Sequence, residues 1–255
     1  MASSGLPDWW FMALFGMGAL VMRGAGCTVN DLVDRDFDRM VTRTVGRPIA
    51  NGDLSVLQAF ALLAFLLGIG LAILLQFNGV TVGLGLASLI LVIVYPFMKR
   101  FTYWPQAFLG LTFNWGALMG WAAVTGALEA PALWMYIAGL FWTLGYDTIY
   151  AHQDKADDLL VGVKSTALKF GTATTKWLVG FYAITIVLLG LAGSAVAMAW
   201  PYYAGLMAGA AHLTWQVLTV NFDTPKSCLR LFKSNRDFGL IILVGIVIAR
   251  AAGAA

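Results

Sequence analysis

Long apolar stretches separated by short polar connections dominate the sequence. Residues 54–98 and 177–222 contain no Asp, Glu, Lys or Arg. Each stretch is about twice as long as the roughly 20 residues that a helix needs to cross the hydrocarbon core of a membrane. Each therefore predicts two membrane-spanning helices, with breaks at residues 78–79 and 200–201, where Gly and Pro interrupt the apolar pattern.

Four further apolar stretches complete the prediction: residues 9–30, 101–128, 130–146 with its flanks, and 238–255. The chain is 60% hydrophobic and only 11% charged, with a mean hydropathy of +0.79. This is more apolar surface than a soluble core of 255 residues needs. We therefore expect an all-α membrane protein with about eight transmembrane helices in one polytopic domain over residues 1–255.

Charged residues gather on one side of the predicted bundle. The connections after the first, third, fifth and seventh spans hold 14 of the 16 Lys and Arg residues, and the opposite connections hold none. This asymmetry predicts that the basic side faces the cytoplasm of a bacterium or the matrix of a mitochondrion, with the chain in the inner membrane. Eleven of the 13 acidic residues lie on or beside the same side, and positive-inside bias gives no reason for them.

The remaining general features suggest little further chemistry. Cys27 and Cys228 are too few for a disulfide framework or a metal cluster, and we expect both to be packing residues. No basic segment precedes the first apolar stretch, so we expect no cleavable signal. The bilayer is the expected partner surface, and no nucleic-acid partner is expected.

A first acidic cluster follows the first span with no Gly or Pro between them. Asn30, Asp34 and Asp38 recur every four residues, and Asp31 precedes Asp34 by three, so all four share one helical face. No lysine is interleaved to relieve the repulsion between the carboxylates, and Arg35 points to another side of the helix. Oxygen ligands from Asp and Asn suit a hard divalent cation such as Mg²⁺.

A second acidic cluster follows the fifth span, where Asp147, Tyr150, Asp154 and Asp158 form a stripe at helical spacing. Asp147 lies near the membrane end of its helix. An ionisable side chain within a membrane costs about 3 kcal/mol, which makes this residue a functional candidate. Two groups of metal-binding carboxylates on one side of a membrane, with basic residues nearby, are suited to binding a diphosphate.

Basic residues near the two clusters are the candidate diphosphate ligands: Arg35, Arg43, Arg47, Lys99, Arg100, Lys155 and Lys164. Tyr95 lies four residues before Lys99 at the end of a span, where we expect Pro96 to kink the helix and expose both groups. The later basic residues are interpreted as topology signals: Lys226, Arg230, Lys233 and Arg236.

These motifs resemble those of the UbiA-type intramembrane prenyltransferases. The first cluster reads NDLVDRDFD and is similar to the family's first motif, the second cluster to its second motif, and the spacing from Tyr95 to Lys99 to a third. Segments such as RGAGCTVNDLVDRDFDRMVTRTVGRPIANGDLS and GVKSTALKFG are most similar to members that act on 4-hydroxybenzoate in ubiquinone synthesis. The resemblance covers nearly the whole chain.

The resemblance implies a fold and an activity. It implies two pseudo-repeated helical bundles around a central cavity, with helical loops forming a cap on the cytoplasmic side. It further implies Mg²⁺-dependent transfer of a polyprenyl group from polyprenyl diphosphate to the 3-position of 4-hydroxybenzoate. The expected catalytic residues are Asp34, Asp154, Lys99 and Tyr95, and the expected metal ligands are Asn30, Asp31, Asp34, Asp38, Asp147, Asp154 and Asp158. Arg23, two helical turns before Asn30, and Tyr150 are expected to contact the aromatic substrate.

Several alternatives remain open at this stage. Relatives prenylate haem, homogentisate or naphthoate rings, so the fold does not determine the acceptor. Ion-coupled transporters also carry ionisable residues within membrane helices. However, transport favours charges near mid-membrane, whereas these carboxylates lie at helix ends. Membrane CDP-alcohol phosphotransferases have an Asp-Gly within their motif, and neither cluster here contains one.

Two further expectations concern single elements. His212 lies four residues before Gln216 in an apolar span, which favours an interhelical hydrogen bond made by His212, while the sequence favours no particular role for His152. Family members typically have nine spans, and we align the first span here with the family's second. We therefore expect a further apolar segment of roughly 20 residues to be encoded upstream.

Overall fold

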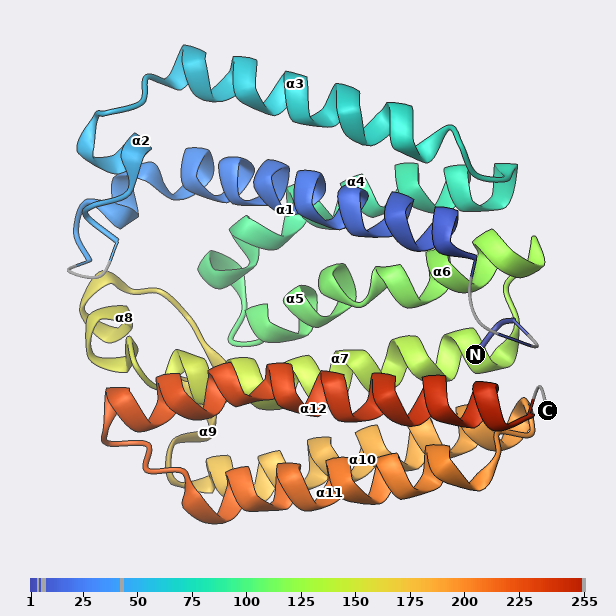
Figure 1. Cartoon of the computed structure of the whole chain (residues 1–255). Coiled ribbons are helices and arrows are strands. Elements are labelled where there is room, and N and C mark those ends of the chain that lie inside the picture. Colours follow the sequence, from blue (N-terminus) through green and yellow to red (C-terminus); the bar gives the residue numbers. More distant parts are fainter. Residues whose placement is uncertain (4, 6–7, 42–43, 254–255) are drawn as a thin grey trace.

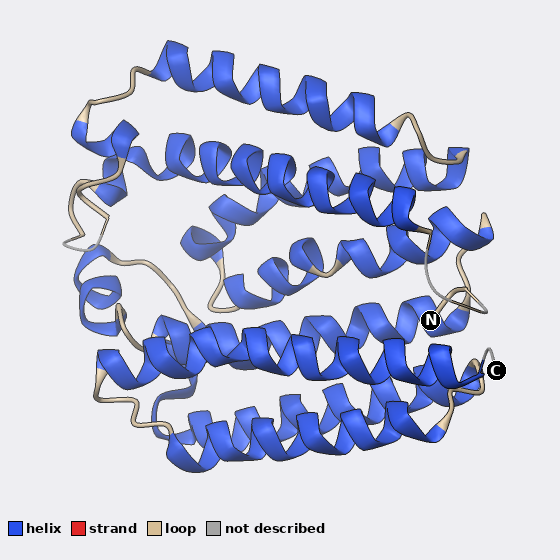
Figure 2. Ribbon diagram, viewed as in Figure 1, coloured by secondary structure: helices blue, strands red, loops and turns tan. Residues whose placement is uncertain are grey.

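The structure is a computed structural model that describes residues 1–3, 5, 8–41 and 44–253, and within these residues all regular structure is helical (Figure 2). The helices are α1 (Trp9–Asp38), α2 (Pro48–Asn51), α3 (Val56–Leu74), α4 (Gly79–Phe101), α5 (Pro105–Phe113), α6 (Trp115–Thr125), α7 (Ala130–Ala151), α8 (Lys155–Val161), α9 (Thr166–Phe170), α10 (Thr174–Ala195), α11 (Trp200–Thr219) and α12 (Pro225–Gly253). A short 3₁₀ helix, Gly171–Ala173, joins α9 to α10.

Long helical segments run side by side along the molecule (Figure 1). In the described residues they are α1, α3, α4, the α5–α6 pair, α7, α10, α11 and α12. Within the described residues, five segments are long and apolar enough to cross a membrane, namely α1, α3, α4, residues 105–125 and residues 166–195. Helices α7, α11 and α12 have 22, 20 and 29 residues and lie alongside them, although they do not meet that criterion. The predicted all-α membrane fold is confirmed, and the helix count is compatible with about eight spans.

The helices form two groups that meet at α7 (Figure 1). Helix α1 packs on α3 and α4 in the first group, and α10, α11 and α12 pack together in the second. Helix α7 contacts α5 on one side and α10 and α12 on the other. Many large apolar side chains remain exposed on the outer faces, including Leu57, Phe65, Met207 and Leu218, as expected for a surface in contact with lipid.

Both predicted breaks between spans are confirmed, because α4 begins at Gly79 and α11 begins at Trp200. The Asn78 side chain caps α4 by accepting a hydrogen bond from the backbone N–H of Thr81 (3.0 Å). The same side chain donates to the carbonyl of Ala122 (2.7 Å) and so ties this turn to α6. Pro201 stands in the first turn of α11, a position that tolerates its missing N–H.

One break was not predicted: the span over residues 105–125 is interrupted at Asn114, between α5 and α6. The side-chain amide of Asn114 donates to the carbonyl of Gly110 and to the hydroxyl of Thr143, each at 2.8 Å. The amide thus satisfies a carbonyl of the last turn of α5 and links the break to α7. Asn within an otherwise apolar stretch was the available signal.

The second acidic stripe is not continuous, which corrects the sequence-based expectation. Asp147 and Tyr150 lie on α7, but α7 ends at Ala151, and Asp154 is the N-cap residue of the separate helix α8. The C-cap residue of α7, His152, is buried, and its Nε2 lies 3.1 Å from the hydroxyl oxygen of Thr174 at the start of α10. The α8 segment therefore folds back toward α9 instead of extending the stripe.

The two cysteines have different environments. Cys228 is fully buried among Ile149, Leu178 and Leu231, as expected of a packing residue. Cys27 is exposed on α1, so the expectation that it packs in the core is wrong. Its side chain points out of the bundle because Ala25 and Thr28 hold the buried face of that turn.

Candidate active site

The two acidic clusters line a single cavity at the end of the bundle where α2, α8 and α9 lie (Figure 1). Its volume is about 240 Å³. The ionisable and amide side chains that line it are Asn30, Asp34, Asp38, Arg47, Tyr95, Lys99, Gln106, Asp147, Tyr150, Asp154, Asp158 and Lys164. Helices α1, α4, α5, α7 and α8 each contribute to it. Residues far apart in sequence thus form a site with both acidic and basic groups.

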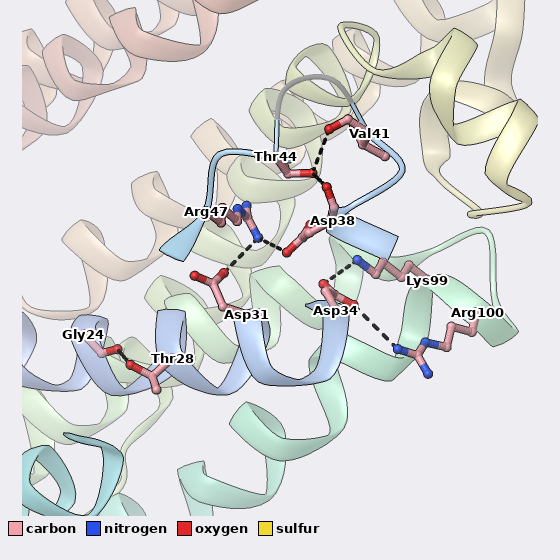
Figure 3. Close-up of polar contacts among 10 residues, drawn as sticks. All are labelled: Gly24, Thr28, Asp31, Asp34, Asp38, Val41, Thr44, Arg47, Lys99 and Arg100. Atoms are coloured by element: carbon pink, nitrogen blue, oxygen red, sulfur yellow. Dashed lines mark hydrogen bonds and ion pairs between the residues drawn. The ribbon is translucent and has the colours of Figure 1, made fainter. Parts of the chain in front are cut away.

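Asp34 is the most deeply buried carboxylate of the first cluster, with 1% of its side chain exposed. One of its oxygens, Oδ2, forms a close ion pair with the ammonium group of Lys99 from α4 (Figure 3). The other, Oδ1, has no hydrogen-bond partner among the residues that the structure describes and lies 3.8 Å from Nη2 of Arg100. Asp34 is therefore paired with Lys99 and lies at ion-pair distance from Arg100, while its Oδ1 accepts no hydrogen bond from the described residues.

Arg100 lies beside Asp34 but does not line the cavity. Its Nη2 donates to the carbonyl of Val33 at 2.8 Å, and its guanidinium lies 4.8 Å from the ring centroid of Phe37. These contacts fix Arg100 against α1. The structure gives no support to the diphosphate contact predicted for it.

Arg47 bridges the other two carboxylates of the first cluster. Its Nη1 lies 2.9 Å from Oδ1 of Asp31 and 2.9 Å from Oδ2 of Asp38 (Figure 3). The hydroxyl of Thr44 donates to the carbonyl of Asp38 at 3.1 Å, which fastens the loop that carries Arg47 to the end of α1. Asp31 itself does not line the cavity. The repulsion along the acidic stripe is thus relieved by Arg47 and Lys99.

Asp147 provides a contrasting carboxylate from α7. It lines the same cavity, and it makes no hydrogen bond or ion pair within the described residues. Tyr95 lies close enough to both Asp34 and Asp147 to interact with them electrostatically. Tyr95 lines the same cavity as Asp34 and Asp147.

The donor set fits a hard divalent cation. No group of three or more Asp, Glu, His or Cys side chains is gathered in metal-binding geometry within the part of the chain that the structure describes. However, Asp34 has an oxygen without a hydrogen-bond partner, and the carboxylate of Asp147 has no cationic partner among those residues. Both line one cavity. Carboxylate oxygens from two sides of a cavity suit Mg²⁺, which takes one or two carboxylates together with water and phosphate oxygens.

Several predicted site residues lie elsewhere. Arg35 pairs with Asp36 at 3.1 Å on the exposed side of α1, because it is one residue, and so about a quarter of a turn, from Asp34. Lys155 is exposed and does not line the cavity. The structure gives no support to the diphosphate contacts predicted for these two residues. Arg43 lies outside the described residues.

Of the two residues expected to contact the aromatic substrate, only Tyr150 lines the cavity. Tyr150 lines the cavity, and its ring packs on Phe232 of α12 with centroids 4.4 Å apart. Arg23 does not line the cavity, but it lies close enough to Tyr146 of α7 to interact with it electrostatically. Tyr146, which the sequence analysis did not single out, accepts a hydrogen bond from the hydroxyl of Thr143 (3.2 Å).

Gln106 and Ser165 are further cavity residues that sequence reasoning missed. Oε1 of Gln106 accepts a hydrogen bond from the backbone N–H of Thr166 at 3.0 Å, which ties α5 to the start of α9. Ser165 caps α9 by accepting from the backbone N–H of Leu168. Neither residue belongs to a charged pattern, so no motif spacing indicated them.

The two histidines have structural roles. His152 is buried against Phe222 (ring centroids 4.5 Å apart). Burial and the nearby charge of Lys155 lower the pKa of His152 to about 4, so its ring is neutral near pH 7. The interhelical hydrogen bond predicted for His212 is not seen among the described residues, because its Nε2 lies 3.2 Å from Gln216 on the same helix. Gln216 makes such a contact instead, by donating to Ser234 of α12 (3.0 Å).

Comparison with known proteins gives the family. The UbiA prenyltransferase family model matches residues 1–241. The protein "4-hydroxybenzoate polyprenyltransferase, mitochondrial" of Homo sapiens is 53% identical over 243 residues, which cover 95% of this chain and 66% of that protein. The protein of the same name from Arabidopsis thaliana is 54% identical over 248 residues, covering 96% and 61%. The chain thus spans about two thirds of the length of such relatives or slightly less.

Solved structures with low sequence identity share the fold. The apo structure of a UbiA homolog from Aeropyrum pernix K1 superposes with a TM-score of 0.82 at 23% identity, covering 97% of this chain and 92% of that chain. A UbiA homolog from Archaeoglobus fulgidus, bound to GPP and Mg²⁺, gives a TM-score of 0.71 at 22% identity, covering 96% and 89%. The match to the family model, together with the cavity and the acidic clusters that line it, shows that the chain belongs to the UbiA prenyltransferase family.

Proposed function

We propose that this protein transfers a polyprenyl group from polyprenyl diphosphate to the 3-position of 4-hydroxybenzoate, with Mg²⁺ as cofactor. One observation carries the proposal: carboxylates from α1, α7 and α8 line a single cavity together with Arg47, Lys99 and Lys164. The names of relatives that are 53–54% identical support the acceptor. The homolog structure bound to GPP and Mg²⁺ supports the donor and the metal.

The carboxylates of the cavity and the amide oxygen of Asn30 are proposed as the metal ligands: Asn30, Asp34 and Asp38 from α1, and Asp147, Asp154 and Asp158 from the second cluster. Asp31 is proposed to act indirectly, by holding Arg47 through their ion pair. Mg²⁺ bound there would neutralise the charge that develops on the diphosphate leaving group. Arg47, Lys99 and Lys164 would bind the remaining phosphate oxygens by charge-assisted hydrogen bonds.

In the proposed reaction, the bond between the first prenyl carbon and the diphosphate oxygen breaks, and its electron pair leaves with the diphosphate. The allylic cation then bonds to the ring carbon ortho to the phenol, and that carbon loses its proton. Lys99 and Arg47 hold the leaving diphosphate away from the cation. The rings of Tyr95 and Tyr150 face the cavity, where aromatic faces stabilise a cation by roughly 0.5 to 2 kcal/mol each.

An aromatic column extends from this cavity into the bundle. Tyr150 packs on Phe232, Phe232 on Tyr146, and Tyr146 on Trp142, with centroid distances of 4.4, 5.7 and 5.3 Å. The column reaches a second, mostly apolar cavity of about 200 Å³ beside Trp142 and Phe238. We infer that the column excludes water from the cation and that the second cavity accommodates part of the prenyl chain.

The acceptor is proposed to bind between the two helices that carry Arg23 and Tyr146. A carboxylate beside Arg23 would turn the phenol end of the acceptor toward Tyr150 and the acidic clusters. The test is a turnover assay of the purified protein with Mg²⁺ and farnesyl diphosphate, offering 4-hydroxybenzoate, homogentisate and dihydroxynaphthoate separately. We expect turnover to favour 4-hydroxybenzoate, and equal or greater turnover of another acceptor would contradict this assignment.

A further inference from the structure

Arg47 forms ion pairs with two carboxylates of the first cluster, Asp31 and Asp38. Its Nη1 is 2.9 Å from both Asp31 and Asp38, which lie two helical turns apart on the same face of α1 (Figure 3). We propose that Arg47 is an internal counter-cation, which holds these carboxylates until diphosphate arrives and then transfers to it, so that metal and diphosphate bind together. This inference rests on the proposed function and deepens it.

The electrostatics of the bridge explain why a metal ion alone would bind weakly. The exposed fractions of the side chains are 8% for Asp38, 23% for Asp31 and 30% for Arg47, so all three charges are largely shielded from water. A divalent cation that binds Oδ2 of Asp38 must displace the guanidinium from that oxygen. Arg47 then keeps Asp31 but loses one of the two carboxylates that balance its partly buried charge, which is unfavourable.

A diphosphate removes that penalty. Its oxygens accept the two parallel N–H bonds that a guanidinium offers. Arg47 already lines the cavity that holds both acidic clusters, so it can exchange carboxylate for phosphate without leaving the site. Because each ligand then favours the state that binds the other, metal and diphosphate strengthen each other's binding reciprocally.

The way Arg47 is held is consistent with exchange. Its side chain bonds only to Asp31 and Asp38 within the described residues, and its backbone precedes the four-residue helix α2. Arg100 is different, because its guanidinium also donates to the backbone of Val33 and stacks on Phe37. Of these two arginines beside α1, Arg47 is the one whose contacts a bound diphosphate can replace.

The experiment measures the affinity for Mn²⁺, a spectroscopic substitute for Mg²⁺, by electron paramagnetic resonance. It uses the purified chain in lipid nanodiscs, alone and with farnesyl thiodiphosphate, and corrects for the metal that the analogue binds in solution. The wild type is compared with Arg47→Gln, which removes the charge, and with Arg47→Lys, which keeps it. Arg236→Gln is the matched control, because Arg236 pairs with Asp237 (3.0 Å) on an exposed part of α12.

In the wild type, we expect the thiodiphosphate to raise the Mn²⁺ affinity at least fivefold, the lower end of typical coupling between two ligands. Arg47→Gln should bind Mn²⁺ alone at least fivefold more tightly than the wild type and lose most of the enhancement. Arg47→Lys should bind Mn²⁺ alone about as the wild type does, because it keeps the charge, but should show a smaller enhancement, because an ammonium group lacks the two parallel N–H donors. Arg236→Gln should match the wild type in both measurements. The enhancement in the wild type needs no variant. If Arg47→Gln fails to fold, that enhancement still tests whether metal and diphosphate strengthen each other's binding.

Unchanged or weaker binding of Mn²⁺ alone by a folded Arg47→Gln would overturn the exchange, and so would the lack of any enhancement in the wild type. The activity assay separates this result from the proposed function. Prenylation of 4-hydroxybenzoate without the predicted Mn²⁺ behaviour would overturn the exchange and leave the proposed function standing. The predicted Mn²⁺ behaviour without prenylation of 4-hydroxybenzoate would support the exchange and count against the acceptor.

Discussion

The ammonium group of Lys99 on α4 forms an ion pair with the buried carboxylate of Asp34 on α1, across 65 residues of sequence (Figure 3). The pair joins the third motif to the first and places both residues at the wall of the cavity. Lys99 therefore has two functions in the proposed mechanism: it neutralises Asp34 in the free protein and supplies a positive charge for the diphosphate.

Replacing Lys99 by Ala should raise the apparent KM for prenyl diphosphate about tenfold or more, because a hydrogen bond to a charged group contributes about 1.5 to 3 kcal/mol. The KM for 4-hydroxybenzoate should change much less. Initial rates with each substrate varied in turn measure both constants. Lys176→Ala is the control, since Lys176 is exposed and does not line the cavity. Equal effects of Lys99→Ala on both constants would argue against a diphosphate role.

Asp34→Asn and Asp154→Asn should each lower kcat at least about a hundredfold, because each removes a charged metal ligand proposed to support several kcal/mol of transition-state stabilisation. Both variants should remain folded, as judged by helical circular dichroism and size-exclusion chromatography. The matched control is Asp36→Asn, which changes an exposed carboxylate paired with Arg35 on the same helix. Full activity in either site variant would refute the model of two metal-binding clusters.

Removal of divalent metal separates a metal-dependent transferase from an ion-coupled transporter. In proteoliposomes, excess EDTA should stop product formation, and Mg²⁺ should restore it, because the proposed cavity carboxylates hold the metal. Imposed proton or sodium gradients should leave the rate unchanged, since the acidic clusters lie together at one end of the bundle. Solute uptake that depends on such a gradient would favour the transport alternative instead.

The contact between α7 and α10 provides a test of the fold. A Cβ atom at Gly145 would lie 2.2 Å from a ring carbon of Tyr182, and the hydroxyl of Tyr182 is fixed by donation to Gln216 (2.9 Å). Gly145→Ala should therefore lower the free energy of unfolding by about 1 to 3 kcal/mol. Thermal unfolding in detergent measures the effect.

Gly180→Ala on α10 is the control for Gly145→Ala, because a Cβ atom there meets nothing within 4 Å. It should leave stability unchanged or raise it by up to about 1 kcal/mol, as expected where Ala replaces Gly in a helix without strain. If both substitutions shifted the melting temperature equally, the close approach of Gly145 to Tyr182 would be wrong.

Much of the fold was predictable because membrane spans and helix ends depend on local sequence. Asn78 and Pro201 mark the ends of spans through cap and turn chemistry that acts within a few residues. The common face of Asn30, Asp34 and Asp38 follows from helical periodicity alone. All three line the same cavity.

The remaining features depend on contacts between distant segments. Where α7 ends at Ala151, His152 contacts Thr174 of α10, and spacing within the second motif gives no sign of that contact. Arg35 and Arg47 looked alike as basic neighbours of the first cluster. Only the path of the loop before α2 shows that Arg47 turns back onto Asp31 and Asp38.

The most direct test of the central claim is mass spectrometry of the product made from fully ring-deuterated 4-hydroxybenzoate and farnesyl diphosphate by the purified protein with Mg²⁺. The account predicts a prenylated acid that has lost one ring deuterium, because the new bond forms at the ring carbon ortho to the phenol. It also predicts that one diphosphate is released for each product molecule. A prenyl ether that retains every deuterium, or the absence of any prenylated acid from an intact, folded protein, would contradict it.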